Sequence, residues 1–306
     1  MITDITKHMN CIQHCIYNIC KKYGLAEFLI FCNGWSFFYD AAKDFNQSLN
    51  IPTEETSNYF LREYQGLQCE KITVNKYSPE DVTKLVFKNI TNNRDVVVEM
   101  NSFYCTWHKG YNKICVPHFF QIVDVDICKS KAICMDSYFS KYKEEVSIEE
   151  ILAGCDVIRF FYCDEAKKRI NPQSIVEQIK KTVNINQITD SMSLFAGKLL
   201  DIDNTSELFD NDENIFFCNN TRYLRFISDS RFCMSYLFDK LGEFEDETLY
   251  YDISKKFFEC GLAYEKINSY YMKLYYKKTN IKQNLRILSN KILEIQKNEI
   301  LIYDML

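Results

Sequence analysis

Residues 117–136, PHFFQIVDVDICKSKAICMD, decide the fold of the first half of this chain. Within them, HFFQIVDVD (118–126) and KAICMD (131–136) are short runs rich in β-branched and aromatic residues, which is typical of buried strands. The connection DICKS is short enough for a hairpin, so the two strands are expected to pair in antiparallel fashion. His118 opens the first strand and Asp136 closes the second. Hairpin pairing therefore predicts that this histidine and this aspartate lie close together.

Upstream, residues 11–23, CIQHCIYNICKKY, have their apolar residues at helical spacing, and Gly24 follows where a helix would stop. Cys11 is the first residue of this predicted helix and lies near the edge of its apolar stripe, so the thiol can face outward. The unpaired N–H groups of a first helical turn stabilise a thiolate placed there. A thiolate nucleophile also needs a histidine to move its proton and a third group to orient the imidazole. We therefore expect Cys11, His118 and Asp136 to form a catalytic set.

Two other histidines lie close to Cys11 in the sequence. His14 follows it by three residues and could approach the thiol from the same helix face, although a pair within one helix leaves little room for a substrate. His8 is expected to lie in a loop. Cys15 and Cys20 are on the buried stripe of the predicted helix and are expected to be core residues.

A metal site is the main alternative role for His118. Cys105, His108, Cys115 and His118 form the pattern C-x2-H-x6-C-x2-H, which has zinc-ligand residue types in paired spacing. A metal held there would take His118 away from catalysis. The interval between the pairs is short and the second pair lies at a strand start, so the sequence favours a site without a metal.

Strands and helices occupy different halves of the sequence. A third strand is expected at residues 95–101, DVVVEMN, and the pattern becomes helical from Ser147 onward. The second half contains long periodic segments, among them NPQSIVEQIKKTV, SRFCMSYLFDKL and NLRILSNKILEIQKNEILIYDML. A chain of 306 residues also suits two domains. The sequence therefore predicts an α+β protein, with a catalytic domain at 1–165, in which the nucleophile helix packs on an antiparallel sheet, and an all-α domain at 166–306.

Composition excludes several classes of protein. With 47% apolar and 26% charged residues, the chain can bury a sizeable core and is not of the disordered class. The net charge of -5 and the pI of about 5.6 give no reason to expect a nucleic-acid partner. The first residues lack the features of a signal peptide, and no apolar run approaches the length of about twenty residues that spans a membrane. We expect a cytoplasmic protein without a membrane partner, whose 14 cysteines are mostly reduced core residues.

Several of these segments resemble known families. CIQHCIYNICKKYG, PHFFQIVDVD and CMDSYF resemble the nucleophile helix and the histidine and aspartate strands of the papain-like peptidases that process bacteriocin leaders. The longer order VVVEMNSFY, PHFFQIVDVD, AICMDSYFSKY and SIEEILAGC, followed by SRFCMSYLFDKL and the helical tail, is more similar to the butirosin-type acyltransferases of peptide natural-product assembly. The resemblance covers nearly the whole chain. Each motif is moderately specific, and their common order strengthens the likeness.

The resemblance implies a papain-like N-terminal domain and amide-forming acyl transfer. In that family an acyl or peptidyl group leaves a phosphopantetheine thioester on a carrier protein, is held on the cysteine and passes to a small amine. Carried onto this sequence, Cys11 is the nucleophile, His118 the general base and acid, and Asp136 the orienting carboxylate. The implied partners are a carrier protein and a small amine, with no bound cofactor or metal. The alternative is a cytosolic cysteine peptidase or amidase that uses the same three residues.

The sequence departs from the papain-like pattern just before the nucleophile. Where such peptidases usually have a glutamine as oxyanion donor, this chain has ITKHMN. Asn10 or His8 is the expected substitute beside the backbone N–H of Cys11, because the donor must point at the developing oxyanion. Ser137 follows Asp136 where the peptidases more often have proline, which affects the exit of the strand more than its charge.

The sequence assigns no substrate-binding residue. The aromatic segment FFECGLAYEKINSYYMKLYY could exclude water and shape an acyl pocket, but it is equally suited to a helical core. The apolar helix faces near the C-terminus also fit an internal core and a homodimer equally well.

Overall fold

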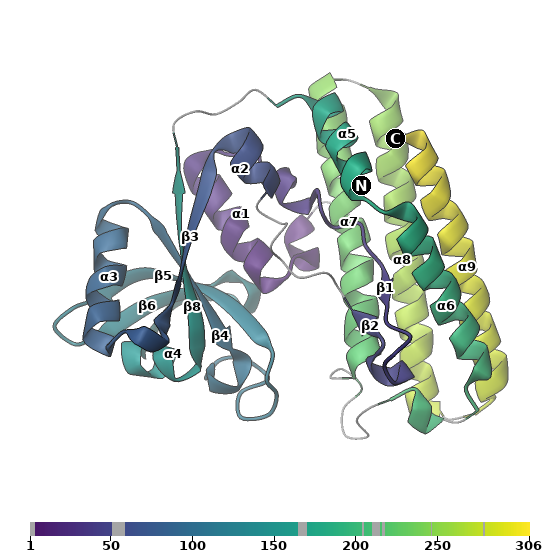
Figure 1. Ribbon diagram of the computed structural model, residues 1–306, viewed down its shortest axis with the longest axis horizontal. Helices are drawn as coiled ribbons and strands as arrows, with labels where there is room; N and C mark the ends of the chain where they lie inside the picture. The colour runs from purple at the N-terminus through teal and green to yellow at the C-terminus, as the bar shows by residue number, and fades with distance from the viewer. Residues whose placement is uncertain are drawn as a thin grey trace. The chain divides into compact units, whose positions relative to one another are not determined.

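The computed structural model describes residues 4–50, 59–164, 170–203, 205–209, 215, 218–245, 247–277 and 279–306 (Figure 1). The chain forms two compact units. The sheet unit comprises Met9–Ile30 and Asn58–Ile170, and the helical unit comprises Met1–His8, Phe31–Ser57 and Asn171–Leu306. An antiparallel sheet and long helices are both present, so the α+β class expected from the sequence is confirmed.

The two units are not the two consecutive segments, 1–165 and 166–306, that the sequence predicts. Phe31–Ser57 comes early in the chain but belongs with the helices at its end. The predicted boundary between residues 165 and 166 lies outside the described residues. Periodicity cannot reveal this interleaving, because long-range contacts decide to which unit a short segment belongs.

The larger sheet of the described residues has six antiparallel strands. In order across the sheet they are β3 (Leu67–Thr73), β8 (Cys155–Cys163), β4 (Asp95–Asn101), β5 (Pro117–Asp126), β6 (Lys131–Asp136) and β7 (Lys141–Ser147). The strands expected at 95–101, 118–126 and 131–136 are therefore present as β4, β5 and β6. Strands β5 and β6 form the expected hairpin, in which Asp126 pairs with Lys131.

The expectation of a helical pattern from Ser147 onward is wrong for residues 155–163. Helix α4 (Ile148–Gly154) does follow Ser147, whose side chain accepts a hydrogen bond from the backbone N–H of Glu150. The next residue, however, begins β8, which pairs with both β3 and β4. The run CDVIRFFYC has short apolar stretches separated by Asp156 and Arg159, and periodicity alone does not separate such a short strand from a buried helix.

The sheet is covered by helices on both faces. Helix α3 (Pro79–Thr91) and α4 pack on one face, and the core there includes Val82, Val86, Ile148, Ile151, Val96, Val98, Phe120, Ile122, Cys134 and Ile158. Helix α1 (Cys11–Tyr23) contacts Gln121 of β5 through Asn18. Because successive side chains of a strand point to opposite faces, Gln121 and Phe120 belong to different faces, so α1 lies opposite α3 and α4. Helix α2 (Tyr59–Gln65) precedes β3.

Helix α1 begins and ends as the sequence predicts. Asn10 is its N-cap, and its side chain accepts from the backbone N–H of Gln13 while the Gln13 side chain accepts from the backbone N–H of Asn10. This reciprocal pair satisfies two of the N–H groups that an α-helix leaves unpaired at its start. Gly24 ends the helix at φ 61°, in the left-handed conformation that glycine adopts without a steric penalty.

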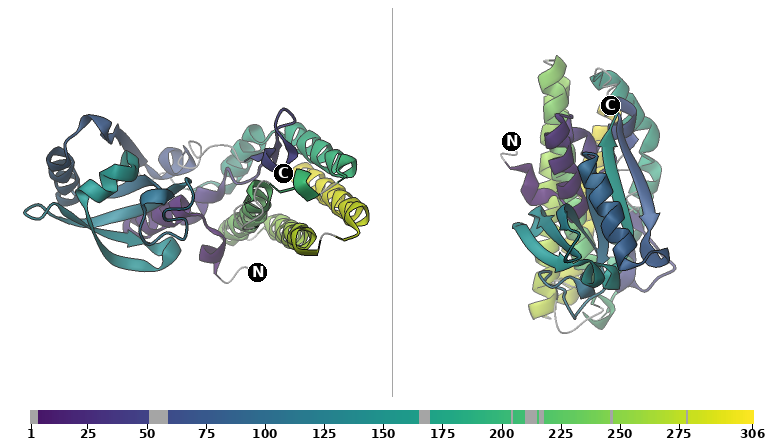
Figure 2. Two further views of the ribbon diagram at one scale, coloured as in Figure 1. Left: turned by 90° about the horizontal axis from the view of Figure 1, so that it is seen from below. Right: turned by 90° about the vertical axis from the view of Figure 1, so that its left-hand side faces the viewer.

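The helical unit contains the long helices expected after residue 165. They are α5 (Pro172–Thr182), α6 (Ile185–Asp201), α7 (Asn219–Glu245), α8 (Thr248–Lys277) and α9 (Ile281–Met305). Helix α7 packs against α8, α8 against α9, and α6 against α9, as the left view of Figure 2 shows along the helix axes. A two-stranded sheet, β1 (Phe38–Tyr39) with β2 (Leu49–Asn50), packs on α6 and α7.

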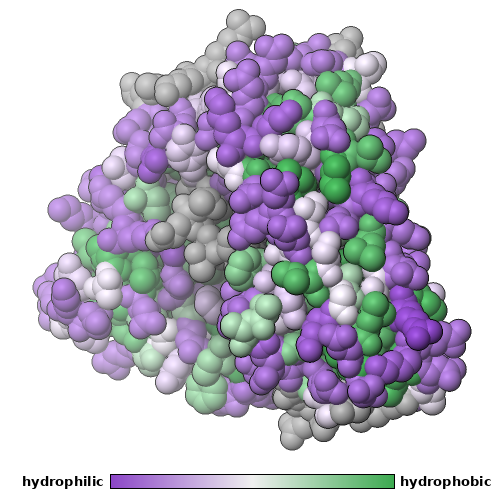
Figure 3. All heavy atoms as spheres, turned by 45° about the vertical axis from the view of Figure 1, so that its right-hand side comes forward, coloured by the Kyte–Doolittle hydropathy of each residue, from purple (hydrophilic) through white to green (hydrophobic). Residues whose placement is uncertain are grey.

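The connections contain short 3₁₀ helices. They are η1 (Ile5–His8), η2 (Glu27–Phe31), η3 (Phe45–Gln47), η5 (Val74–Lys76), η6 (Ser102–Tyr104), η7 (Ser137–Phe139) and η8 (Thr205–Glu207). Within the described residues, no helix has both the length and the apolar character needed to span a membrane. The face in Figure 3 shows mainly hydrophilic residues with scattered hydrophobic ones, an ordinary distribution for a protein surface.

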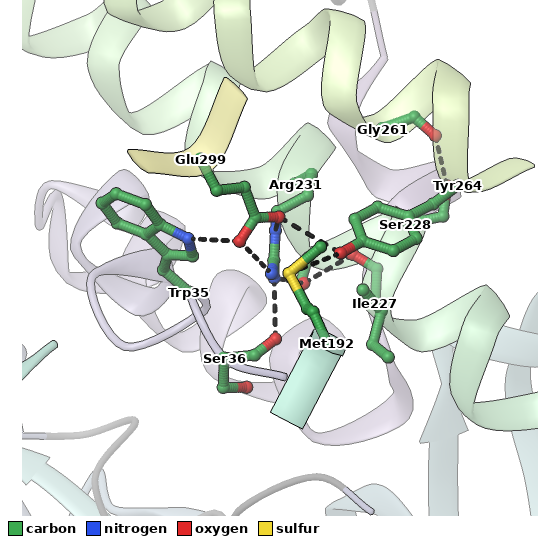
Figure 4. Close-up of polar contacts among 10 residues, drawn as sticks. Trp35, Ser36, Met192, Ile227, Ser228, Arg231, Gly261, Tyr264 and Glu299 are labelled. Atoms are coloured by element: carbon green, nitrogen blue, oxygen red, sulfur yellow. Dashed lines mark hydrogen bonds and ion pairs between the residues drawn. The ribbon is translucent and has the colours of Figure 1, made fainter. Parts of the chain in front are cut away.

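A fully buried ion pair binds Trp35 and Ser36, in the segment Phe31–Ser57, to the long helices of the helical unit (Figure 4). Arg231 of α7 donates from Nε and Nη2 to the two carboxylate oxygens of Glu299 of α9, at 2.8 and 3.0 Å. Trp35 donates its indole N–H to the same carboxylate at 3.0 Å, and Tyr264 of α8 donates its hydroxyl at 3.3 Å. The guanidinium also donates to the backbone carbonyl of Ser36 at 2.9 Å. These contacts explain why Phe31–Ser57 belongs with the helices.

Removing one member of this buried pair should cost more stability than replacing both. We expect Glu299→Leu to lower the free energy of unfolding by about 3–5 kcal/mol, because it leaves the Arg231 charge buried without its partner. The double variant Arg231→Met/Glu299→Leu should lose clearly less, since no buried charge remains. Urea denaturation followed by circular dichroism compares the two. A double variant as unstable as the single one would contradict this account.

Candidate active site

The structure brings together two of the three residues predicted to be catalytic. His118 at the start of β5 and Asp136 at the end of β6 are hydrogen-bonded, with 2.6 Å between Nε2 and Oδ2. Each side chain is only 1% exposed. The hairpin register explains the pair, because Gln121 lies opposite Met135 and both strands continue from there toward the same rim of the sheet.

Asp136 also accepts two other hydrogen bonds. The indole N–H of Trp107 donates to Oδ2 at 2.7 Å, and the backbone N–H of Phe139 donates to Oδ1 at 3.3 Å. Burial alone would raise the pKa of this carboxyl group, but the hydrogen bond and charge of His118, with the other two donors, hold the pKa below its ordinary value. The carboxylate can therefore orient the His118 ring through Nε2. This leaves Nδ1 as the nitrogen that can exchange a proton with a nucleophile.

Cys11 occupies the first position of α1, directly after the Asn10 cap. It is a thiol and is partly exposed. The backbone N–H groups at this end of a helix favour a negative charge, so the position suits a thiolate. The expected setting of the nucleophile, at the start of an amphipathic helix, is thus present.

Two polar anchors fix the direction of α1 along β5. Asn18 Nδ2 donates to Gln121 Oε1 at 3.1 Å. One turn later, Lys22 Nζ contacts both carboxylate oxygens of Asp95 at 3.0 and 3.1 Å. Asp95 opens β4, and the residue that follows it pairs with Ile122, the residue after Gln121. Helix α1 therefore runs in the same direction as β5.

This direction places Cys11 at the same height along the sheet as His118. Cys11 precedes Asn18 by about 10 Å along a helix that rises about 1.5 Å per residue. His118 precedes Gln121 by about 10 Å along a strand that rises about 3.3 Å per residue. Because Asn18 and Gln121 are in contact, Cys11 and His118 are expected at similar heights along the sheet.

The two groups nevertheless belong to opposite faces of β5: Cys11 is on α1, which packs on one face, and the His118 side chain points to the other face. His118 lies three residues before Gln121 on β5, so its side chain points to the opposite face of the sheet, which is the face of Phe120. The ring centroids of His118 and Phe120 are 6.3 Å apart. The two groups can therefore meet only around the rim, where β5 begins. Tyr138 lies at this rim, because its ring is 5.7 Å from that of His14 on α1 and 6.3 Å from that of His118.

The two residues predicted as oxyanion donors have other contacts. The Asn10 carbonyl oxygen accepts the backbone N–H of Gln13 as the helix cap. His8 lies in η1 of the helical unit, where Nδ1 is 2.9 Å from Oδ1 of Asp229 and the ring packs on Phe232. These contacts use Oδ1 of Asn10 and Nδ1 of His8, and the assignment of either residue as the oxyanion donor stays a prediction.

The zinc alternative is not supported by the positions of its four residues. Cys105 is buried, Cys115 is exposed, and His118 is held by Asp136. His108 Nδ1 accepts the backbone N–H of Gly110 at 2.8 Å. In the described part of the chain, no three histidine, cysteine or acidic side chains gather as metal ligands.

Trp107 and His108 are the residues of this site that sequence reasoning missed. The sequence suggested a zinc role for His108 and gave no sign of a role for Trp107 in the site. In the structure the Trp107 N–H supports Asp136, and the His108 ring lies 4.8 Å from the His118 ring. Both residues lie in the segment between β4 and β5, just before His118, and this position is the signal from which the sequence could have indicated their roles.

His108 should remain neutral well below neutral pH. Burial, together with the charge of His118, lowers the pKa of His108 from 6.5 to about 4. The unfolded chain then binds this proton more readily, so the free energy of unfolding should rise as pH increases from about 4 to about 6.5. His108→Asn, which keeps an acceptor for Gly110, should remove this contribution. Histidine NMR checks it directly, and a His108 midpoint near 6.5 would show that the expectation is wrong.

Comparisons with known proteins do not assign a family. No protein-family model matches the sequence, and a search of curated proteins finds no similar sequence. The interpretation of this site therefore depends on its own geometry and on the motifs of the sequence.

Proposed function

We propose that this chain is a cysteine-dependent acyltransferase with a papain-like sheet unit. It takes an acyl or peptidyl group from a carrier-protein thioester onto Cys11 and transfers it to a small amine, forming an amide. The observation on which the proposal depends is the buried His118–Asp136 pair, supported by Trp107, at the height of a thiol on a capped helix start. The order of a helix cysteine, a strand histidine and a next-strand aspartate supports the papain-like assignment.

In the proposed chemistry, these three residues move the protons and hold the acyl group between the two substrates. His118 Nδ1 removes the Cys11 proton, and the thiolate attacks the thioester carbonyl. The tetrahedral intermediate collapses by breaking the bond to the donor sulfur, which leaves as a thiol after taking the proton from His118. The amine then attacks the Cys11 thioester, and His118 takes the amine proton and returns it to the departing Cys11 sulfur. Exchange between two thioesters is nearly thermoneutral, while formation of the amide is downhill.

Transfer and hydrolysis differ only in whether an amine or water reaches the acyl-enzyme. The resemblance of the motifs, in order, to the butirosin-type acyltransferases favours the amine. A cysteine peptidase or amidase with the same residues is the alternative. We also propose a cytoplasmic location, supported by the fact that all fourteen cysteines lie among the described residues and are thiols.

Intact-protein mass spectrometry tests the proposal. After incubation with acyl-phosphopantetheine thioesters, wild-type protein should gain one acyl group and Cys11→Ala should gain none. The double variant Cys115→Ser/Cys128→Ser, which removes the two exposed thiols, is the matched control and should acylate like the wild type. Addition of an amine should release an amide. Release as free acid alone would indicate a hydrolase, and an adduct retained in Cys11→Ala would exclude the assigned nucleophile.

Trp107→Phe should slow acylation without unfolding the site. Phenylalanine keeps an aromatic ring against Phe120 but removes the N–H that donates to Asp136. A hydrogen bond to a charged group is worth about 1.5–3 kcal/mol, so we expect the acylation rate to fall by roughly 10-fold to 100-fold. Stopped reactions analysed by mass spectrometry give this rate. An unchanged rate would show that Trp107 is only part of the core.

A further inference from the structure

His108 places a second imidazole beside the catalytic pair. Its ring centroid is 4.8 Å from that of His118 and 4.9 Å from that of Phe139, which it meets edge-on at 90°. The residue is partly buried rather than enclosed.

The segment that holds His108 is fixed by hydrogen bonds at its base. Ser102, which is fully buried, donates its hydroxyl to the carbonyl of Ile114 at 2.8 Å and accepts the backbone N–H of Val116 at 3.1 Å. The backbone N–H of His108 donates to the carbonyl of Cys105 at 2.9 Å. The imidazole is therefore held on a rigid support, as a preorganised donor requires.

The contact with Gly110 determines which ring nitrogen of His108 has the proton. The backbone N–H of Gly110 donates to Nδ1 at 2.8 Å, so Nδ1 has a lone pair and the proton of the neutral ring is on Nε2. A side chain at position 110 would bring its Cβ to 2.9 Å from this nitrogen and 2.5 Å from Ile114, so glycine permits the close approach. Among the described residues, Nε2–H has no hydrogen-bond acceptor, so it can donate to a bound molecule.

The proposed reaction needs a donor for the carbonyl oxygen that becomes negative. The sequence offers Asn10, whose Oδ1 caps α1, and His8, whose Nδ1 contacts Asp229, and the structure adds His108 as a third candidate. A neutral imidazole N–H is a suitable donor, because it does not compete with His118 for the proton. The lowered pKa of His108, about 4, is consistent with this neutral state.

We propose that the Nε2–H of His108 donates a hydrogen bond to the carbonyl oxygen of the acyl donor, which makes His108 a further catalytic residue. This inference rests on the proposed acyltransferase function. Through this hydrogen bond the site would recognise a polar group of the substrate, the carbonyl next to the thioester sulfur. Removing a preorganised donor of this kind typically lowers the rate by about 10²-fold to 10³-fold.

Two substitutions separate the two nitrogens of the ring. The amide of His108→Asn can replace Nδ1 as the acceptor for Gly110 but cannot reach the place of Nε2. The amide of His108→Gln can offer an N–H near the place of Nε2 but gives up the Gly110 contact. Acylation by an acetyl-phosphopantetheine thioester at saturation should fall by about 100-fold in His108→Asn and by less than about 10-fold in His108→Gln.

The opposite order, or equal losses in both variants, would overturn the donor assignment and leave a structural role for the ring. Wild-type protein that forms no adduct at all would instead defeat the proposed function. A second measurement does not depend on either variant. In Cys11→Ala, the Nε2–H proton resonance of His108 should shift when an acetyl-phosphopantetheine analogue with an amide in place of the thioester is added, and a saturating analogue that leaves it unmoved would overturn the proposal.

Discussion

A carboxylate that is almost completely removed from water needs hydrogen-bond donors, and Asp136 has three: His118, Trp107 and the backbone of Phe139. Each donor fixes a different part of the sheet unit. His118 ties β5 to the end of β6, Trp107 ties down the segment after β4, and Phe139 closes the turn that leads to β7. The His118–Asp136 pair is thus the point where the rim of the sheet is held together.

The strands and helices that sequence reasoning found are those with local signals. The apolar runs of β4, β5 and β6, and the Asn10 and Gly24 ends of α1, can all be recognised within a few residues. Strand β8 was missed because it follows α4 without a connecting loop and its apolar run has no period of its own. The place of Phe31–Ser57 was missed for a different reason. Its partners, such as Glu299, lie far away in the sequence.

The candidate site likewise contains one contact that a local motif predicts and others that depend on long-range folding. The pairing of His118 with Asp136 follows from a hairpin, which is a local motif, so the sequence could predict it. The roles of Trp107 and His108 depend on how an irregular segment folds around buried Ser102, and no local pattern specifies that path. The alignment of Cys11 with His118 depends on two long-range side-chain contacts, Asn18 with Gln121 and Lys22 with Asp95, which periodicity does not encode.

The interleaving of the two units has a consequence for how the chain is made. The sheet unit ends at Ile170, so all of its strands have been synthesised before α5 to α9 exist. Trp35 and Phe37 therefore lack their packing partners Phe195, Phe257 and Tyr264 until α6 and α8 have been synthesised. An early hydrophobic segment without its partners is prone to wrong association. The order of synthesis therefore makes the buried contact of Trp35 with Glu299 depend on α9, the last of the described helices.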